Sequence, residues 1–461
     1  MRARSIAGWS AALLAATIVT VPSATASPAG DRPTGTTAAT HTVTARTTGA
    51  LGVGGGQAAA RSRTKKVHRF QPDYGPTFNN PLGDGPTKYR ALNVVQAAIQ
   101  HARKKSIIRI MSWNIMSRSV VTYLLRAQQR GVRVLAIMDQ NNMTEVPNPS
   151  FRRLRAGLHQ NNRNMKLPKR RRSHAMVCVH SCRGSRGQAH SKFFLFSHTG
   201  GAHKVVMEGS MNLTAAASTN QWNDVYAIHS RKLYRFGRHI FGQMLRDRPA
   251  PRQYQKMRAG SVTLSFAPER GRNFHRDPRM ALLDKVRCWG AKGAGEHGRT
   301  IIRMAPDVMR GALGMRAAQR IRQLWQAGCD IRVGYTVLGR DIHRLLTDPS
   351  GRRGAVPIKH LVQDFNGDGE FDNYFHLKVL TINGHLGHNR GAHVTVQGSA
   401  NLSALATGSD ENIGVIRRTH ATLRYQGYIE YWLNNFPKSV PMTTSARRLG
   451  PVDPYAHVDM D

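Results

Sequence analysis

Apolar positions recur along the chain with two periods, that of a helix and that of a strand. In the first half, residues 92–102 carry apolar side chains at helical spacing, and the apolar run at 106–111 predicts a strand. A helix that begins at Ser117 or Ser119 is expected to reach residue 130 and to stop at Gly131. Residues 132–138 then predict a second strand.

The second half repeats this order of elements. Residues 280–286 have helical spacing, and residues 300–304 predict a strand. A helix over 313–327 is expected to stop at Gly328, before a strand at 331–335. Helices that alternate with strands are typical of an α/β fold, and two copies of one order predict a pair of domains related by a pseudo-two-fold axis.

The N-terminal segment has the composition of an export signal. Arg2 and Arg4 are followed by an apolar run at 11–21 that is too short for a bilayer span, and Ala24-Thr25-Ala26 matches a cleavage site. We therefore predict a signal peptide at 1–26 and a secreted, extracellular protein.

Composition also predicts a leader and a linker, and the linker divides the rest of the chain into two domains. Residues 27–67 are rich in Thr, Ala and Gly and cannot bury a core, so they predict a disordered leader. Pro249, Pro251 and Gly260 suit a linker. We expect one domain over 68–254 and a second over 255–461.

The charge balance narrows the class of partner. Lys and Arg number 68, and Asp and Glu number 26, so the formal net charge is +42. Such a surface gathers polyanions. The expected partners are a phospholipid or another phosphodiester polyanion, an anionic membrane surface, or nucleic acid.

Four cysteines are consistent with an oxidising compartment. Of the three pairings we favour Cys178–Cys182 with Cys288–Cys329. The alternatives are a zinc site, whose usual spacing differs, and a free buried thiol at Cys288.

Two short motifs occur once in each half of the chain. H-x-K lies at 190–192 and 376–378, and G-S-x-N lies at 209–212 and 398–401. We expect each H-x-K on a strand, whose period of two places His and Lys on one face, and each G-S-x-N at the end of the next strand.

Two such sets facing each other predict a phosphodiester site. The lysines and asparagines would bind the non-bridging oxygens and stabilise the transition state. One histidine would attack phosphorus and the other would protonate the leaving oxygen.

The repeated motifs resemble the phospholipase D superfamily, whose signature is H-x-K-x4-D followed by G-S-x-N. The resemblance extends over most of the chain from about residue 68. It implies two α/β/α sandwich domains of the phospholipase D type, one active site at their interface, a phosphohistidine intermediate and no metal for the chemistry. Both half-sites lie in one chain, which predicts a monomer.

The resemblance also implies roles for individual residues. His190 is expected to be the nucleophile, as the N-terminal histidine often is in two-copy members, and His376 the general acid. Ser210 and Ser399 would support the site. The residues implied to be catalytic are His190, Lys192, Asn212, His376, Lys378 and Asn401.

The chain departs from the family pattern at the motif aspartates. Ser197 and Asn383 stand where the family has Asp. Family members often have a Glu-Asn pair about ten residues after G-S-x-N, and its carboxylate orients a catalytic histidine. The second half has Glu411-Asn412 and the first has Asn223-Asp224, so Glu411 and Asp224 are interpreted as the histidine partners.

An acidic cluster precedes the second H-x-K motif. It matches positions one, three, five and six of a calcium loop but lacks the Glu at position twelve. A structural calcium site and a plain Asp/Gly turn are both consistent with it. The candidate ligands are Asp364, Asn366, Asp368, Glu370 and Asp372.

Three functions are consistent with these features. The first is a secreted phospholipase D-type hydrolase that removes phospholipid head groups. The second is a secreted nuclease of the same superfamily that cleaves DNA or RNA. The third is an inactive polyanion-binding protein, which the two lost aspartates would explain.

Overall fold

The computed structural model describes residues 70–268, 276–443 and 452–458. These ranges belong to one compact unit, Val67–Asp461. The signal peptide and leader predicted for residues 1–67 lie outside the described residues. Within the described ranges, none of the helices combines the length and the hydrophobicity that a membrane span needs.

The first half is built on a seven-stranded sheet with the order β1-β7-β6-β5-β2-β3-β4. Strands β2, β3 and β4 are parallel, and the remaining neighbours are antiparallel. Its strands are β1 (Gly75–Phe78), β2 (Ile107–Met111), β3 (Arg133–Asp139), β4 (His174–Cys178), β5 (Phe193–Thr199), β6 (Ala202–Gly209) and β7 (Asp224–His229). Its helices are α1 (Gly85–Lys88), α2 (Arg90–Gln100), α3 (Arg118–Gln129), α4 (Asn141–Thr144), α5 (Pro149–Asn164), α6 (Ala216–Thr219) and α7 (Arg231–Met244), with a 3-10 turn at Lys169–Arg171.

The second half repeats this sheet. Its main order is β15-β13-β11-β18-β19-β20-β9-β8, and β10 pairs with β18. Its strands are β8 (Gln255–Ala259), β9 (Val262–Phe266), β10 (Val286–Arg287), β11 (Ile301–Pro306), β12 (Val308–Met309), β13 (Asp330–Tyr335), β14 (Val337–Leu338), β15 (Ile358–His360), β16 (Val362–Gln363), β17 (Asn373–Tyr374), β18 (Lys378–Leu386), β19 (Asn389–Gly398) and β20 (Asn412–Ile416). Its helices are α8 (Pro278–Leu283), α9 (Gly311–Gln326), α10 (Arg340–Thr347), α11 (Ala404–Gly408) and α12 (Thr419–Asn435).

The two sheets have matching topology. Read from β4 to β1, the first sheet has the same order and directions as the second read from β15 to β9. The α/β class predicted from the sequence is confirmed. The boundary predicted between residues 254 and 255 falls between α7 and β8.

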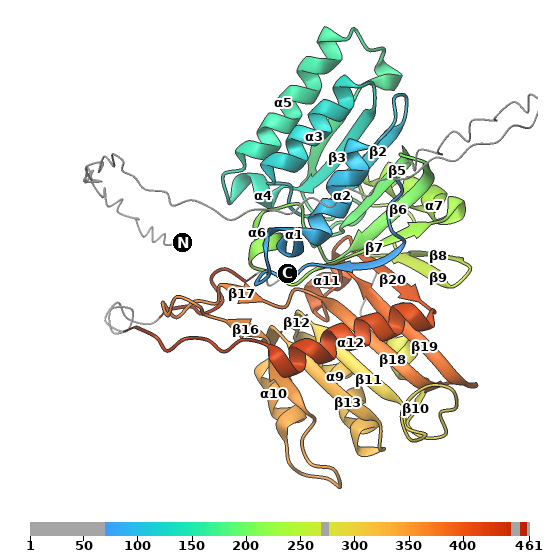
Figure 1. Cartoon of the computed structure of the whole chain (residues 1–461), viewed down its shortest axis with the longest axis vertical. Coiled ribbons are helices and arrows are strands. Elements are labelled where there is room, and N and C mark those ends of the chain that lie inside the picture. The colour runs from blue at the N-terminus through green and yellow to red at the C-terminus, as the bar shows by residue number, and fades with distance from the viewer. Residues whose placement is uncertain (1–69, 269–275, 444–451, 459–461) are drawn as a thin grey trace, which may run out of the picture. The chain divides into compact units, whose positions relative to one another are not determined.

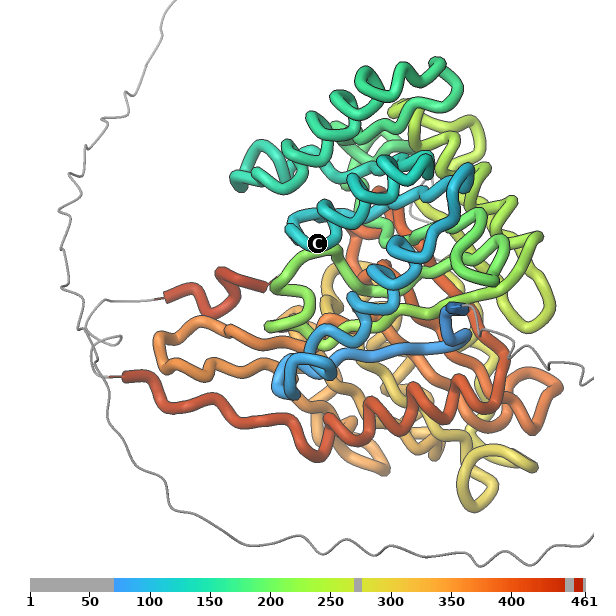
Figure 2. Tube along the Cα trace, turned by 45° about the horizontal axis from the view of Figure 1, so that its top comes forward, coloured from blue at the N-terminus to red at the C-terminus, as the bar shows by residue number. Residues whose placement is uncertain are grey.

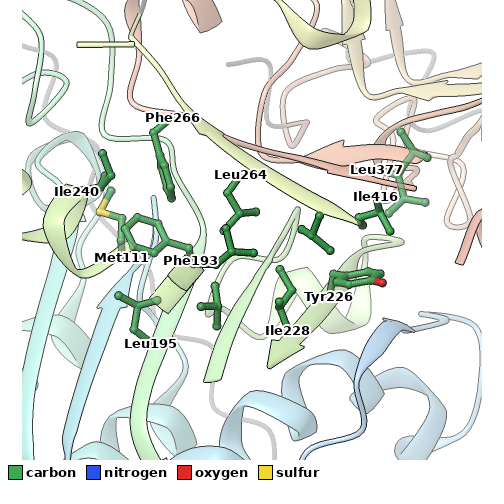
Figure 3. Close-up of a cluster of buried hydrophobic side chains, with 14 of the residues drawn as sticks. Met111, Phe193, Leu195, Tyr226, Ile228, Ile240, Leu264, Phe266, Leu377 and Ile416 are labelled. Carbon is green, nitrogen blue, oxygen red and sulfur yellow. The ribbon is translucent and has the colours of Figure 1, made fainter. Parts of the chain in front are cut away.

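Buried side chains form a layered core. One cluster joins the first sheet to α2, α3 and α5, and another joins the second sheet to α8, α9 and α10. A third cluster lies between the sheets and contains residues of α7 and α12 together with Phe193, Phe266 and Ile416, so it spans both halves (Figure 3). Strand β1 runs beside α12, where Phe78 stacks on Tyr428 with centroids 4.1 Å apart (Figures 1 and 2).

Most of the elements predicted from the sequence are present with small shifts at their ends. Ser117 is the N-cap of α3, where its side chain accepts a hydrogen bond from the Val120 amide. The helix expected over 280–286 is too long at its C-terminus, because α8 ends at Leu283 and Val286 belongs to β10. Both predicted disulfides, Cys178–Cys182 and Cys288–Cys329, are confirmed.

Candidate active site

The first H-x-K motif lies in the segment that leads into β5. The prediction that it lies on the strand is wrong by a few residues, since β5 begins at Phe193. The two residues are still in contact, because Lys192 Nζ donates to the backbone carbonyl of His190 at 2.8 Å. His190 is only 1% exposed, and its segment is anchored where the Ala189 amide donates to Asp139 Oδ2 at 2.7 Å.

The second motif has the same local arrangement. His376 precedes β18 and Lys378 is its first residue. Lys378 Nζ donates to the carbonyl of His376 at 3.0 Å. Both residues are buried, so each half presents a histidine and a lysine from equivalent positions.

The glycines of the G-S-x-N motifs allow two strands to approach closely. A Cβ added at Gly209 would lie 2.4 Å from the carbonyl oxygen of Asp224, and one at Gly398 would lie 2.2 Å from that of Asn412. Any side chain would therefore push the neighbouring strand away. These close approaches place Ser210 and Ser399 against the residues that support the histidines.

Glu411 of the second half supports the histidine of the first. His190 Nδ1 and Glu411 Oε1 are 2.9 Å apart, and Ser399 donates its hydroxyl proton to Glu411 Oε2. The predicted contact between Glu411 and a motif histidine is thus confirmed. Burial alone would raise the pKa of Glu411, but the adjacent His190, Lys192 and Ser399 hold it below its ordinary value.

Asn223 of the first half supports the histidine of the second. His376 Nδ1 lies 2.7 Å from Asn223 Oδ1, and Ser210 donates to the same oxygen at 2.8 Å. The two supports therefore cross between the halves in opposite directions, and they join both motifs into one site.

The interpretation of Asp224 as a histidine partner is wrong. Asp224 is equivalent to Asn412, and it accepts hydrogen bonds from the Ser210 amide and from the Tyr425 hydroxyl. Burial raises its pKa, opposed by these hydrogen bonds. The histidine partner in the first half is the amide of Asn223, one position earlier.

The residues next to each lysine differ between the halves. Trp113 follows β2, and its ring lies 5.7 Å from Lys192 Nζ and edge-on to His190. At the equivalent position after β11 lies Asp307, whose Oδ2 is 2.8 Å from Lys378 Nζ and 3.8 Å from His376 Nε2. At this position Lys378 thus has a carboxylate and Lys192 has an aromatic ring.

Several polar atoms in the site are available to a ligand. Among the described residues, His190 Nε2, Asn212 Oδ1 and Asn401 Nδ2 are buried without a hydrogen-bond partner. Buried polar atoms of this kind usually have partners in folded proteins. An imidazole nitrogen can attack a phosphoryl group that lysine and asparagine side chains hold.

Glu208 and Gln397 form a further link between the halves. They precede the two motif glycines, and Gln397 donates to Glu208 Oε1. Asn412 donates to Glu208 Oε2 at 2.9 Å and accepts from the Lys192 amide at 2.6 Å. Burial raises the pKa of Glu208 from its ordinary 4.5 to about 8, against the hydrogen bond from Asn412.

The two missing motif aspartates do not remove groups from the site. Ser197 lies on β5 and accepts from the Ile107 amide at 2.7 Å. Asn383 lies on β18, where it accepts from the Gly295 amide and donates to Gln426. Both positions make hydrogen bonds between structural elements.

The acidic loop is folded on its own backbone. Asp364 accepts from the amides of Gly367 and Gly369, Asn366 from that of Asp368, and Asp368 from that of Glu370. Asp372 accepts from the Phe365 amide. Within 70–268, 276–443 and 452–458, no three His, Cys, Asp or Glu side chains are grouped to hold a metal ion. The loop therefore has the hydrogen bonds of an Asx-rich turn, and calcium binding stays a prediction.

Three site residues were not predicted from the sequence, namely Trp113, Asp307 and Asn223. Trp113 lies two residues after the end of β2 and Asp307 directly follows β11, and polar or aromatic residues at such strand ends can indicate a site. Asn223 could have been found by aligning the strands, since Gly209 pairs with Val225 and Gly398 with Ile413.

The chain is similar to known proteins in one segment of its sequence and in its fold. Residues 95–245 match the family model described as cardiolipin synthase, PLD-like domain. No curated protein matches the chain in sequence.

Among solved structures, a phosphatidylserine synthase of Haemophilus influenzae is similar at 13% identity, with a TM-score of 0.50, 80% of this chain covered and 88% of that one. This identity shows the fold alone. A polyphosphate kinase of Porphyromonas gingivalis matches at 13% identity and a TM-score of 0.49 over 81% of this chain, which spans 54% of the kinase. The phospholipase D family member Nuc of Salmonella typhimurium matches at 20% identity and a TM-score of 0.27, over 37% of this chain and 95% of its own.

Proposed function

Because this chain belongs to the phospholipase D superfamily, we propose that it cleaves a phosphodiester in two steps through a covalent intermediate on His190. The observation that carries the assignment is the contact of Glu411 with His190 Nδ1 at 2.9 Å. A carboxylate there holds the proton on Nδ1 and leaves the lone pair of Nε2 for attack. His376 has an amide oxygen at the same place, which suits the other role.

The first step forms a bond between His190 Nε2 and phosphorus. The bond from phosphorus to the leaving oxygen breaks, and His376 gives its proton to that oxygen. Lys192, Lys378 and Asn401 bind the non-bridging oxygens and stabilise the charge of the transition state.

The second step restores the enzyme. His376 takes a proton from water, and the hydroxide attacks phosphorus as the bond to His190 Nε2 breaks. The product is a phosphomonoester, and both histidines return to their starting protonation. An alcohol in place of water would give transfer to that alcohol.

The proposed substrate is a phospholipid, with the head group as the leaving alcohol and phosphatidic acid as the product. The match of residues 95–245 to a model described as cardiolipin synthase, PLD-like domain supports it. The protein would act outside the cell as a monomer. The two disulfides support an oxidising location.

A nuclease is the second candidate, and the net charge of +42 favours it. Phosphate contacts dominate the affinity of proteins for nucleic acid. Both reactions use the same chemistry at His190 and differ only in the alcohol that leaves.

Mass spectrometry of mixed phospholipid vesicles tests the lipid substrate, with the protein and its His190→Ala variant side by side. We expect phosphatidic acid from the unchanged protein alone. A plasmid digest runs in parallel, and cleavage there without lipid turnover would replace the lipid with nucleic acid. If the protein cleaves neither the lipid nor the plasmid, and does not cleave bis(4-nitrophenyl) phosphate either, the proposed activity is wrong. The protein would then be one that binds polyanions without cleaving them.

Chelation tests the metal requirement. The reaction is proposed to proceed without a metal ion, because Lys192 and Lys378 supply the positive charge. We expect EDTA to leave turnover of bis(4-nitrophenyl) phosphate unchanged. If the acidic loop at 364–372 binds calcium for structure, EDTA should lower the melting temperature instead.

A further inference from the structure

An open groove of about 1430 Å³ lies apart from the active-site residues. It is lined by α7, the β8–β9 hairpin, α8 and β20, and none of the residues proposed to be catalytic is among its walls. Eight of its nineteen described lining residues are Arg or Lys, and none of the nineteen is Asp or Glu. We propose that this groove is a second binding site, for a linear chain of phosphate groups.

The basic residues that α7 contributes to the groove destabilise the helix itself. Arg231, Lys232 and Arg235 lie in its first turns and are exposed, and its first turn has no acidic residue. Cations near the N-terminus oppose the helix dipole, and Arg231 repels Arg235 one turn later. Among the described residues these three form no ion pair with the protein, so their charge is available to an external anion.

The other elements around the groove supply further cations and neutral donors. Lys256 comes from β8, Lys285 follows α8, and Arg417 follows β20. Thr263 and Ser265 add hydroxyl groups between them. Cations from several elements around one groove, with hydroxyl groups among them, suit successive phosphates of one strand, as in grooves that follow a nucleic-acid backbone.

A bilayer surface fits this groove less well. Peripheral binding to lipid combines basic residues with exposed apolar side chains that enter the interface. The exposed large apolar side chains of the described residues, such as Trp289, Leu423 and Tyr431, all lie outside the groove. A concave basic surface favours a thin, flexible polyanion.

Two sources share the required chemistry, a single-stranded nucleic acid and inorganic polyphosphate. Tyr254 lines the groove and is half-buried, so its ring offers one surface for a base. Tighter binding of an oligonucleotide than of polyphosphate with the same number of phosphates would identify nucleic acid. Equal binding would identify recognition of phosphate alone.

The test compares two sets of charge removal on two exposed helical faces. The groove variant carries Arg231→Gln, Lys232→Gln and Arg235→Gln, and the matched control carries Arg152→Gln, Arg153→Gln and Arg155→Gln on α5. All six arginine and lysine residues are exposed. Glutamine keeps helix propensity. Each is made in the full chain with His190→Ala, which prevents cleavage, and binding of a labelled oligothymidylate of about 20 nucleotides is measured by anisotropy at several salt concentrations.

We expect the groove variant to bind about 10- to 100-fold more weakly at 0.1 M salt, with the slope of log K against log salt shallower by about 2 for three lost contacts. The control should stay within about threefold of the parent. Equal losses in both variants, or no loss in the groove variant, would overturn the proposal. So would loss of binding to phosphatidylglycerol vesicles without loss of oligonucleotide or polyphosphate binding, which would make the groove a membrane contact.

Two readouts separate this proposal from folding and from the proposed function. The melting temperature of the groove variant should not fall, because the substitutions relieve the repulsion on α7. With His190 restored, turnover of bis(4-nitrophenyl) phosphate should equal that of the unchanged protein. The binding result is independent of turnover, so a failed activity would leave it intact.

Discussion

The charges around His190 are arranged differently from those around His376. His190 has the carboxylate of Glu411 on Nδ1 and the ring of Trp113 beside it. His376 has the amide of Asn223 on Nδ1 and the carboxylate of Asp307 on the side of Nε2. Equivalent backbones thus hold the two imidazoles with negative charge on opposite sides.

This difference teaches how a repeated fold produces two roles. A carboxylate behind the ring holds the proton on Nδ1 and leaves the lone pair of Nε2 toward the substrate, which suits a nucleophile. A carboxylate in front of the ring, shared with Lys378, stabilises a protonated imidazole at the position from which it donates. The topology is repeated, and a few side chains at matched positions break the symmetry.

The largest expected effect separates the two histidines directly. His190→Ala should lose at least about 10⁴-fold in turnover of bis(4-nitrophenyl) phosphate, because no covalent intermediate can form. His376→Ala should still release one equivalent of 4-nitrophenol in a burst, since this leaving group needs no proton, and should then stall before hydrolysis. Stopped-flow absorbance measures both. A burst in His190→Ala and none in His376→Ala would exchange the assigned roles.

The next effect concerns the carboxylate behind His190. In Glu411→Gln the amide NH₂ faces Nδ1 while the oxygen accepts from Ser399, so the proton moves to Nε2 and blocks attack. We expect turnover about 10²- to 10⁴-fold lower, as for carboxylate loss in comparable dyads.

Asn223→Asp is the control for that substitution at the equivalent position. It places a carboxylate behind His376 and keeps the acceptor for Ser210. Its effect should stay within about tenfold, because general acid catalysis tolerates a change in basicity better than the nucleophile tolerates a lost lone pair. Equal losses in the two variants would show that the halves are not specialised.

A smaller effect is expected at the residues that follow β2 and β11. Asp307→Asn removes the carboxylate that holds Lys378 Nζ at 2.8 Å, and kcat/KM should fall about 10- to 100-fold, the range of one charged hydrogen bond. Trp113→Phe keeps an aromatic face toward Lys192 and should cost less than about fivefold. Steady-state kinetics with a diester measures both, and a larger loss at Trp113 would contradict the comparison.

The smallest effect concerns stability at the interface between the halves. The pKa of Glu208 is raised from 4.5 to about 8, so between these values the folded state holds a proton that the unfolded state has lost. Stability from this group is fully present below about pH 4.5 and is lost as the pH rises through about 8. In Glu208→Gln the amide replaces the protonated acid, so the variant should gain several degrees in melting temperature relative to the parent at pH 8.5 and little at pH 5.

Glu145→Gln changes an exposed carboxylate and serves as the control for that titration. Its effect on the melting temperature should be the same at both pH values. A gain for Glu208→Gln that does not depend on pH would show that packing, and not the proton, explains it.

Much of this fold could be predicted from the sequence, because its signals are local. The spacing of apolar residues over 92–138 and 300–335 predicts most of the central strands and helices, and the paired motifs predict the site. The sequence favours Asp224 over Asn223 as the histidine partner because Asp224 keeps the carboxylate of the family pair, one position later in that pair. A carboxylate looked like the better histidine partner, but the strand register decides which residue faces the ring.

Other features depend on contacts between distant segments. Asp307 lies 71 residues before Lys378, and nothing in the local pattern links them. The basic groove combines side chains from Arg231 to Arg417. Such surfaces follow from how the two halves pack, which residue spacing alone does not encode.

The crossed supports also set the order in which this chain can become reactive. A ribosome makes His190 long before Glu411, which lies 221 residues later in the sequence. The partner of His376, Asn223, precedes it in the sequence and is already synthesised. In the proposed mechanism His376 assists His190, and the carboxylate that supports His190 is still missing until Glu411 has been synthesised. Under the proposed mechanism, a partly translated chain that lacks Glu411 therefore has no carboxylate to support His190, and both crossed contacts form only after the two halves have been made and have folded together.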